Sequence, residues 1–192
     1  MGTPLEKNKK YSYKDYLNWD GEERWELIDG EPILMTPSPS RLHQKILGFI
    51  FNHLYNYLQD KNCEVYSAPF DVRFAEESVN LEEIDTVVQP DISVICDKNK
   101  LDDRGCKGAP DLIIEIVSPT SVSTDYIKKL NLYCKYKVKE YWIVDPKEKT
   151  VMVYKLLADN DYGKPKIYNA EETIKVNVFP NLTINLWEIF KD

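Results

Sequence analysis

Apolar residues recur every three or four positions in two segments of the chain, which is the spacing of one face of an α-helix. The first segment predicts a helix over residues 41–60, capped by Ser40. The second predicts a helix that begins near residue 124 and continues to about residue 137. Ser12 and Asp15 have the spacing of a capping box, so a third, short helix is predicted near the start of the chain.

Short apolar runs predict the β-strands. Four of these runs cover residues 65–74, 87–96, 111–117 and 140–144. Two more flank Asp29-Gly30, a pair that favours a two-residue type I′ hairpin turn. The acidic stretch 76–85 and the polar stretch 97–108 predict connecting loops.

The order of these elements predicts the fold class. Strand 111–117, helix 124–137 and strand 140–144 form a βαβ unit, whose two strands lie parallel in one sheet with a right-handed crossover. The two preceding strands make that sheet mixed. Alternating runs after residue 150 predict an edge hairpin and a docked tail. We therefore expect one α/β (α+β) domain over residues 1–192, with a mixed central sheet flanked by helices.

Charge limits the classes of partner. The 192 residues carry a net charge of -7, which disfavours a broad nucleic-acid-coating surface, because nonspecific affinity comes mainly from Lys and Arg at phosphates. A local basic cleft is still compatible with this charge. Five lysines stand close together in the sequence near the helix 124–137, namely Lys128, Lys129, Lys135, Lys137 and Lys139.

The cysteines and the overall hydropathy predict a soluble protein of the cytoplasm. The four cysteines form no CxxC pair and have no histidine partners at zinc-finger spacing, so we expect free thiols in ordinary packing roles. No apolar run reaches the roughly 18 residues that a membrane span needs. The first residues lack the apolar core of a secretion signal.

Two carboxylates within apolar strands are the candidate chemistry. Asp91 precedes Ile92 to Cys96, and Glu115 has apolar neighbours on both sides. Burying an unpaired carboxylate costs several kcal/mol, so each needs a proton, a basic partner or a metal ion. Asp111 shares a strand face with Glu115 but lies roughly 13 Å from it, whereas a neighbouring strand carrying Asp91 lies about 4.8 Å away. The pair Asp91 and Glu115 is therefore a candidate divalent-cation site; the alternative is that they cap a turn and pair with a buried base.

Lys129 is the candidate cation. It stands four residues after Asp125 on the predicted helix, so one interpretation is an exposed ion pair between these two side chains. The other interpretation is that Lys129 projects over the carboxylates, where it orients water or stabilises charge that develops on a phosphate.

These residues belong to a longer pattern. Its segments are Glu26-Leu27-Ile28-Asp29-Gly30-Glu31, His43-Gln44, Gln89-Pro90-Asp91, residues 110–119, Asp125 with Lys129 and Tyr133, and residues 140–146. Over about residues 12 to 190 the chain resembles the Uma-type family of restriction endonucleases in the PD-(D/E)XK nuclease superfamily. The superfamily has a lysine two residues after the second acid, where this chain has Val117. The family pattern places a lysine on the following helix, which matches Lys129.

The resemblance implies a restriction-endonuclease-like core and a set of site residues. Asp91, Glu115 and the carbonyl of Ile116 would bind Mg²⁺ or Mn²⁺, and Lys129 would act with them. Glu31 and His43 match family positions near the presumed cleft; their alternatives are a hairpin residue and a first-turn helix residue.

Three functions follow from these observations. The first is metal-dependent hydrolysis of DNA, with duplex DNA as partner and a homodimer expected because two strands need two active sites. The second is a catalytically silent nuclease fold that binds or regulates, which the acidic charge and the missing strand lysine favour. The third is hydrolysis of a small phosphoester.

Overall fold

The computed structural model describes residues 6, 9–35, 39–76, 78–117 and 124–191, with the side chains of 124–126 excepted. Its helices are α1 (Tyr13–Tyr16), α2 (Arg41–Leu58), α3 (Thr124–Lys135) and α4 (Leu186–Phe190). The side chain of Ser12 caps α1 in a capping box with Asp15, and Ser40 caps α2. The three helices predicted from the sequence are therefore confirmed.

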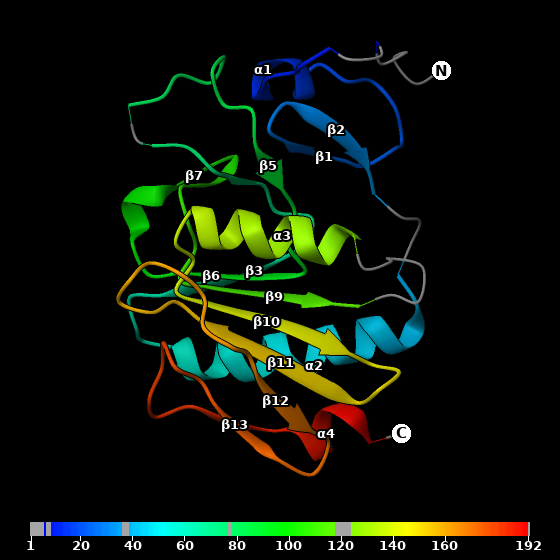
Figure 1. The fold of residues 1–192 in the computed structure, drawn as a ribbon, viewed down its shortest axis with the longest axis vertical. Coiled ribbons are helices and arrows are strands. Elements are labelled where there is room, and N and C mark those ends of the chain that lie inside the picture. The colour runs from blue at the N-terminus through cyan, green and yellow to red at the C-terminus, as the bar shows by residue number, and fades with distance from the viewer. Residues whose placement is uncertain (1–5, 7–8, 36–38, 77, 118–123, 192) are drawn as a thin grey trace.

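A mixed six-stranded sheet forms the centre of the molecule (Figure 1). Its strands in spatial order are β12 (Lys166–Asn169), β11 (Thr150–Lys155), β10 (Glu140–Asp145), β9 (Leu112–Ile116), β6 (Ile92–Ile95) and β3 (Glu64–Ser67). β9 and β10 pair in parallel and α3 connects them, while the other neighbours pair antiparallel. The predicted βαβ unit and mixed sheet are confirmed.

Helices cover both faces of this sheet, with α3 on one side and α2 on the other (Figure 1). The apolar stripe of α2, including Ile46, Ile50 and Leu54, packs in the same core as Ile92 and Ile114. The face toward α3 holds a second core that includes Ile113, Tyr133 and Tyr141. Strand side chains alternate between the two faces, so the odd-numbered residues of β6 and β9 point toward α3.

A second six-stranded sheet was not expected. Its order is β2 (Glu31–Leu34), β1 (Trp25–Ile28), β5 (Val87–Val88), β4 (Val72–Arg73), β8 (Gly105–Lys107) and β7 (Leu101–Asp102). The predicted strands 65–74 and 87–96 were therefore wrong as single strands, since each divides between the two sheets. Pro69 and Pro90 lie in the two breaks, and proline has no N–H to continue a ladder.

Local turns follow the sequence more closely. β1 and β2 form the predicted hairpin, and positive φ at both Asp29 (47°) and Gly30 (79°) is the type I′ geometry. The segment 97–108 is more ordered than the predicted loop, because it contains a 3₁₀ helix (Lys98–Lys100) as well as β7 and β8.

The C-terminal region closes one face of the central sheet. β11 and β12 form the predicted edge hairpin, and β13 (Thr173–Lys175) pairs with β14 (Thr183–Asn185) before α4. Glu140 is fully buried and accepts hydrogen bonds from Trp142, Asn177 and the Val178 amide, which fixes the tail against β10.

Among the described residues, no helix has the length and apolar character needed to cross a membrane.

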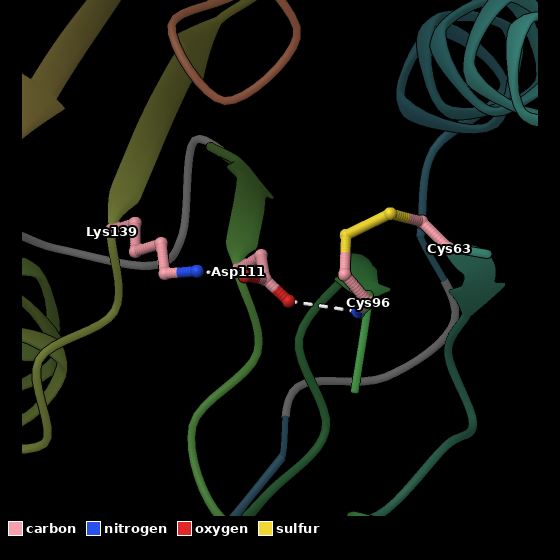
Figure 2. Close-up of a disulfide and its surroundings, with 4 residues drawn as sticks. All are labelled: Cys63, Cys96, Asp111 and Lys139. Carbon is pink, nitrogen blue, oxygen red and sulfur yellow. Dashed lines mark hydrogen bonds and ion pairs between the residues drawn. A yellow bond between two sulfur atoms is a disulfide. The ribbon is translucent and has the colours of Figure 1, made fainter. Parts of the chain in front are cut away.

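Two of the cysteines are paired, which corrects the expectation of four free thiols. Cys63 and Cys96 form a disulfide between β3 and β6, one position beyond the paired residues Glu64 and Ile95 (Figure 2). The other two, Cys106 and Cys134, are free. Sequence spacing missed the pair because the cysteines are 33 positions apart, and the chain between them passes through a different sheet before the strands meet.

Candidate functional site

Strand register brings Asp91 and Glu115 together. β6 and β9 pair antiparallel with Ile92 opposite Ile114, so the next position places Asp91 opposite Glu115. Glu115 belongs to the odd-numbered set that points toward α3, whereas Asp91 directly precedes the first residue of β6. Asp91 enters β6 directly after Pro90, where the chain crosses from the second sheet to the central one. The two carboxylates therefore lie next to the point where the chain passes from the second sheet to the central one.

Side chains of α3 fix the Glu115 carboxylate by hydrogen bonds. Its side chain is 12% exposed, and its Oε1 accepts hydrogen bonds from Lys129 Nζ at 2.9 Å and from Tyr133 OH at 2.7 Å. Lys129 and Tyr133 are four residues apart, which places them on the same face of the helix. One helical face thus supplies an ammonium and a hydroxyl to one carboxylate oxygen.

Lys129 lies between two acids. Its Nζ is 2.9 Å from Glu115 Oε1 and 3.0 Å from Glu26 Oε1, and its side chain is only 17% exposed. This geometry excludes the interpretation of Lys129 as a solvated surface lysine. The other four lysines of the predicted cluster are not in this group: Lys128 is exposed, Lys135 pairs with Asp29, Lys139 pairs with Asp111, and Lys137 has φ of 62° after α3.

Asp91 is held from two sides. Its Oδ2 accepts a hydrogen bond from the Ile116 amide at 2.7 Å and lies 3.1 Å from His43 Nε2. His43 is buried in the first turn of α2, where its own amide donates to Ser40 Oγ. His43 thus reaches Asp91 from the helix on the other face of the sheet.

Glu26 is the site residue that sequence reasoning missed. It lies on β1, and its side chain is 6% exposed. Its Oε1 accepts hydrogen bonds from Lys129 Nζ and from the backbone N–H of Gln89, both at 3.0 Å. The signal was present, because Glu26 interrupts an apolar run between Trp25 and Leu27 as Glu115 does in β9. The Gln89 contact links β1 to the chain that enters Asp91.

The structure places two other acids away from this group. Glu31 is exposed on β2 and pairs with Lys10, and no contact joins it to Glu115 or Lys129 among the described residues. Asp111 accepts a hydrogen bond from the Cys96 amide and pairs with Lys139 (Figure 2). Asp111 is therefore the strand-entry residue that its distance from Glu115 indicated.

Burial and neighbouring charges shift the pKa values of Glu115 and of Lys129. Burial raises the pKa of Glu115; the charge of Lys129 opposes this shift, but the carboxylates of Asp91 and Glu26 add to it, and the pKa lies above its ordinary value. Burial lowers the pKa of Lys129, but Glu115 and Glu26 outweigh it and hold the pKa above its usual range. Lys129 therefore stays protonated, and Glu115 is easier to protonate than an exposed glutamate.

The surroundings of His43 also shift its pKa. Burial lowers its pKa, but the hydrogen bond and charge of Asp91, the charge of Glu115 and the Ile116 backbone together raise it above the ordinary value. A protonated His43 donates its Nε2 hydrogen to Asp91 Oδ2, which orients that carboxylate.

The residues present fit a hard divalent cation. Among the described residues, the hydrogen bonds to Asp91 all end at Oδ2 and those to Glu115 all end at Oε1, so Oδ1 and Oε2 accept none. Two open carboxylate oxygens beside the Ile116 backbone form an all-oxygen donor set of the kind that Mg²⁺ and Mn²⁺ prefer. The same part of the chain contains no cluster of three or more His, Cys, Asp or Glu side chains that could hold a metal alone.

Known proteins share this fold and sequence pattern. A solved structure described as "a putative nuclease belonging to DUF820" from Anabaena variabilis superimposes with a TM-score of 0.74 at 22% identity, over 93% of this chain and 97% of that one. An uncharacterized protein of Synechocystis is 25% identical over 156 residues, which are 80% of this chain and 78% of the relative. Residues 13–186 match the family model Uma2, described as "Putative restriction endonuclease". The chain therefore belongs to the Uma2 family, as the motifs in its sequence indicated.

Proposed function

We propose that this protein is a Mg²⁺- or Mn²⁺-dependent endonuclease that hydrolyses phosphodiester bonds in DNA. The observation that carries the proposal is the contact of Lys129 with Glu115, opposite Asp91 on the neighbouring strand. Two acids and one protonated amine in a half-buried group are the parts that metal-assisted phosphodiester hydrolysis needs. Membership of the Uma2 family supports the same class of reaction.

Each residue has a role that follows from its contacts. Asp91, Glu115 and the Ile116 carbonyl would hold the ion, which supplies Lewis acidity toward the scissile phosphate and toward a bound water. Lys129 stays protonated beside Glu115 and offsets the negative charge that develops on the phosphate in the transition state. Lys129 gives two N–H groups to carboxylates within the described part of the chain, and in the proposal its third N–H orients the attacking water.

His43 is a positioning residue in this proposal. Its Nε2 contacts Asp91 Oδ2, the same oxygen that the Ile116 amide binds, so Asp91 is fixed by two donors while Oδ1 stays open. Partners of this kind orient metal-binding carboxylates and tune metal affinity, by about 10- to 100-fold where measured.

The partners of the proposal are duplex DNA and a second copy of the chain. Cutting both strands of a duplex needs two active sites, and a homodimer supplies them. The acidic net charge requires that DNA binding concentrate near the site rather than over the whole surface.

The test compares two aspartates that directly precede neighbouring strands, Asp91 before β6 and Asp111 before β9. We expect the wild type to bind Mn²⁺ in calorimetry and to cut plasmid DNA only when Mg²⁺ or Mn²⁺ is present. Asp91→Asn should lose both properties, whereas Asp111→Asn should keep both, since Asp111 serves Cys96 and Lys139. Equal cleavage by wild type and Asp91→Asn would overturn the site.

The same experiment decides the second candidate, a silent nuclease fold with a binding or regulatory role. The ion pair of Lys129 with Glu26 and Glu115 favours it, because the lysine already neutralises part of the charge that a metal would bind. If the wild type binds DNA but neither binds Mn²⁺ nor cleaves DNA, this second candidate is established instead.

A further inference from the structure

Glu26 occupies an unusual place for a strand glutamate. It is almost fully buried on β1, in the second sheet, yet it contacts a lysine of α3 that belongs to the central βαβ unit. One oxygen, Oε1, receives both Lys129 Nζ and the Gln89 amide. A buried charge is costly without partners, and the contacts with Lys129 and the Gln89 backbone N–H offset that cost for Glu26.

Those two partners are parts of the proposed reaction centre. Lys129 is the amine that contacts Glu115, and Gln89 lies two residues before Asp91 in Gln89-Pro90-Asp91. Glu26 therefore joins the cation and the strand that carries the first acid through a single oxygen atom. Among the described residues, no hydrogen bond joins the Glu115 side chain to Gln89 or the Asp91 side chain to Lys129.

A lysine needs such a restraint to work at a fixed point. Its long side chain has many accessible rotamers, so one acceptor defines its ammonium position poorly. Glu115 alone is a weak restraint, because it also has to contribute an oxygen to the cation. A second carboxylate that contributes nothing to the cation holds the ammonium in place throughout the reaction.

We propose that Glu26 is a positioning residue of this nuclease: it fixes the Lys129 ammonium over Glu115 and ties it to the segment that leads into Asp91. The proposal rests on the proposed function and adds a residue to it. Because its side chain is only 6% exposed, Glu26 acts through Lys129 rather than by touching DNA.

The first measurement is steady-state cleavage by Glu26→Gln, which keeps the shape and the acceptor for the Gln89 amide but removes the charge. We expect kcat to fall about tenfold or more, with KM for DNA unchanged. Glu26→Asp keeps the charge on a shorter side chain and should lose less. Glu82→Gln is the matched control, since it removes the acid of an exposed Lys14–Glu82 pair, and it should cleave as the wild type does.

The second measurement reads the position of Lys129 without any activity. An amine-specific acylating reagent, followed by peptide mass spectrometry, reports the reactivity of each lysine. Exposed Lys128, next to Lys129 on α3, is the internal reference, and Lys100, whose Nζ donates to the Ala109 carbonyl, reports whether the fold is intact. In Glu26→Gln we expect acylation of Lys129 to rise several-fold relative to Lys128, with Lys100 unchanged.

The two measurements separate the possible failures. Unchanged Lys129 acylation in Glu26→Gln, or full cleavage by that variant, would overturn the role of Glu26. If the wild type does not cleave DNA at all, the nuclease proposal fails, while the acylation pattern still decides whether Glu26 holds Lys129. If Glu26→Gln does not fold, as loss of Lys100 protection would reveal, Glu26→Asp is used for both measurements: a partial loss with raised Lys129 acylation supports the role, and wild-type behaviour refutes it.

Discussion

Lys129 and Glu115 are 14 positions apart on different elements, yet Lys129 Nζ lies 2.9 Å from Glu115 Oε1. Glu115 points from β9 toward the face of the sheet that α3 covers, so a lysine on the side of α3 that faces the sheet contacts it directly. Two residues after Glu115, where the strand itself could carry a lysine, Val117 packs against the hydrophobic core instead. The helix thus supplies the cation that the strand lacks.

This contact predicts that Lys129→Met abolishes cleavage and destabilises the fold. Removing one partner of a buried ion pair leaves uncompensated charge and costs about 3 kcal/mol, at the lower end of the usual range because Glu115 can take up a proton. Urea unfolding of the metal-free protein and plasmid cleavage measure the two effects. Lys128→Met, one residue earlier and exposed, should change neither; a similar loss in both variants would contradict the assignment.

The contact of His43 with Asp91 predicts that replacing His43 lowers the affinity for Mn²⁺. His43→Gln shortens the side chain and removes the ring nitrogen that lies 3.1 Å from Asp91 Oδ2, so the carboxylate loses one of its two fixed donors. We expect Mn²⁺ affinity to fall about tenfold. Calorimetric titration checks this, and His53→Gln is the control, because His53 contacts the Phe49 carbonyl on a distant turn of α2. An unchanged Mn²⁺ dissociation constant in His43→Gln would leave His43 without the proposed role.

The raised pKa of Glu115 predicts the direction of a pH effect. Burial raises this pKa above 4.5, so between that pH and the raised value the folded state binds more protons than the unfolded state. The contribution of Glu115 to stability is therefore fully present below pH 4.5 and is lost as pH rises through the folded pKa. Glu115→Gln, which is neutral at every pH, should remove this part of the pH dependence of urea unfolding in the metal-free protein.

Metal binding should show the opposite preference. An ion binds the ionised carboxylate, so binding at a pH below the raised pKa of Glu115 releases a proton. Mn²⁺ titrations in two buffers with different ionisation enthalpies should give different apparent heats, and affinity should increase with pH. Identical heats in the two buffers would show that Glu115 is already ionised.

Because of the disulfide, we expect the stability of the fold to depend on redox conditions. DNA cleavage should not depend on them. Cys63–Cys96 closes a loop across 33 positions, and such a cross-link contributes about 3 kcal/mol, mainly by restricting the unfolded chain. Reductant or Cys63→Ser should lower the urea midpoint by a corresponding amount. Cys134→Ser, at a free and partly exposed thiol, serves as control. If cleavage falls together with stability under native conditions, the disulfide also shapes the site.

Sequence patterns predicted the local part of this molecule well. Helical spacing, Ser40 and the Ser12–Asp15 box located the helices, and Asp29-Gly30 located a type I′ turn, because caps and turns depend on neighbouring residues. The strand–helix–strand order predicted the parallel pair β9 and β10, because a helical crossover returns the chain to the same end of the sheet.

What the sequence alone determined about the site was its chemical content: two acids in strands and a lysine on the next helix. The tertiary structure decided which other side chains join them. Glu26 enters the group and Glu31 does not, because β1 pairs with β5 and thereby faces the interface with the central sheet, whereas β2 is an edge strand. Both Cys63–Cys96 and Glu26–Lys129 join segments whose closeness depends on strand register and sheet order, and these are set by the packing of the whole chain rather than by the spacing of its residues.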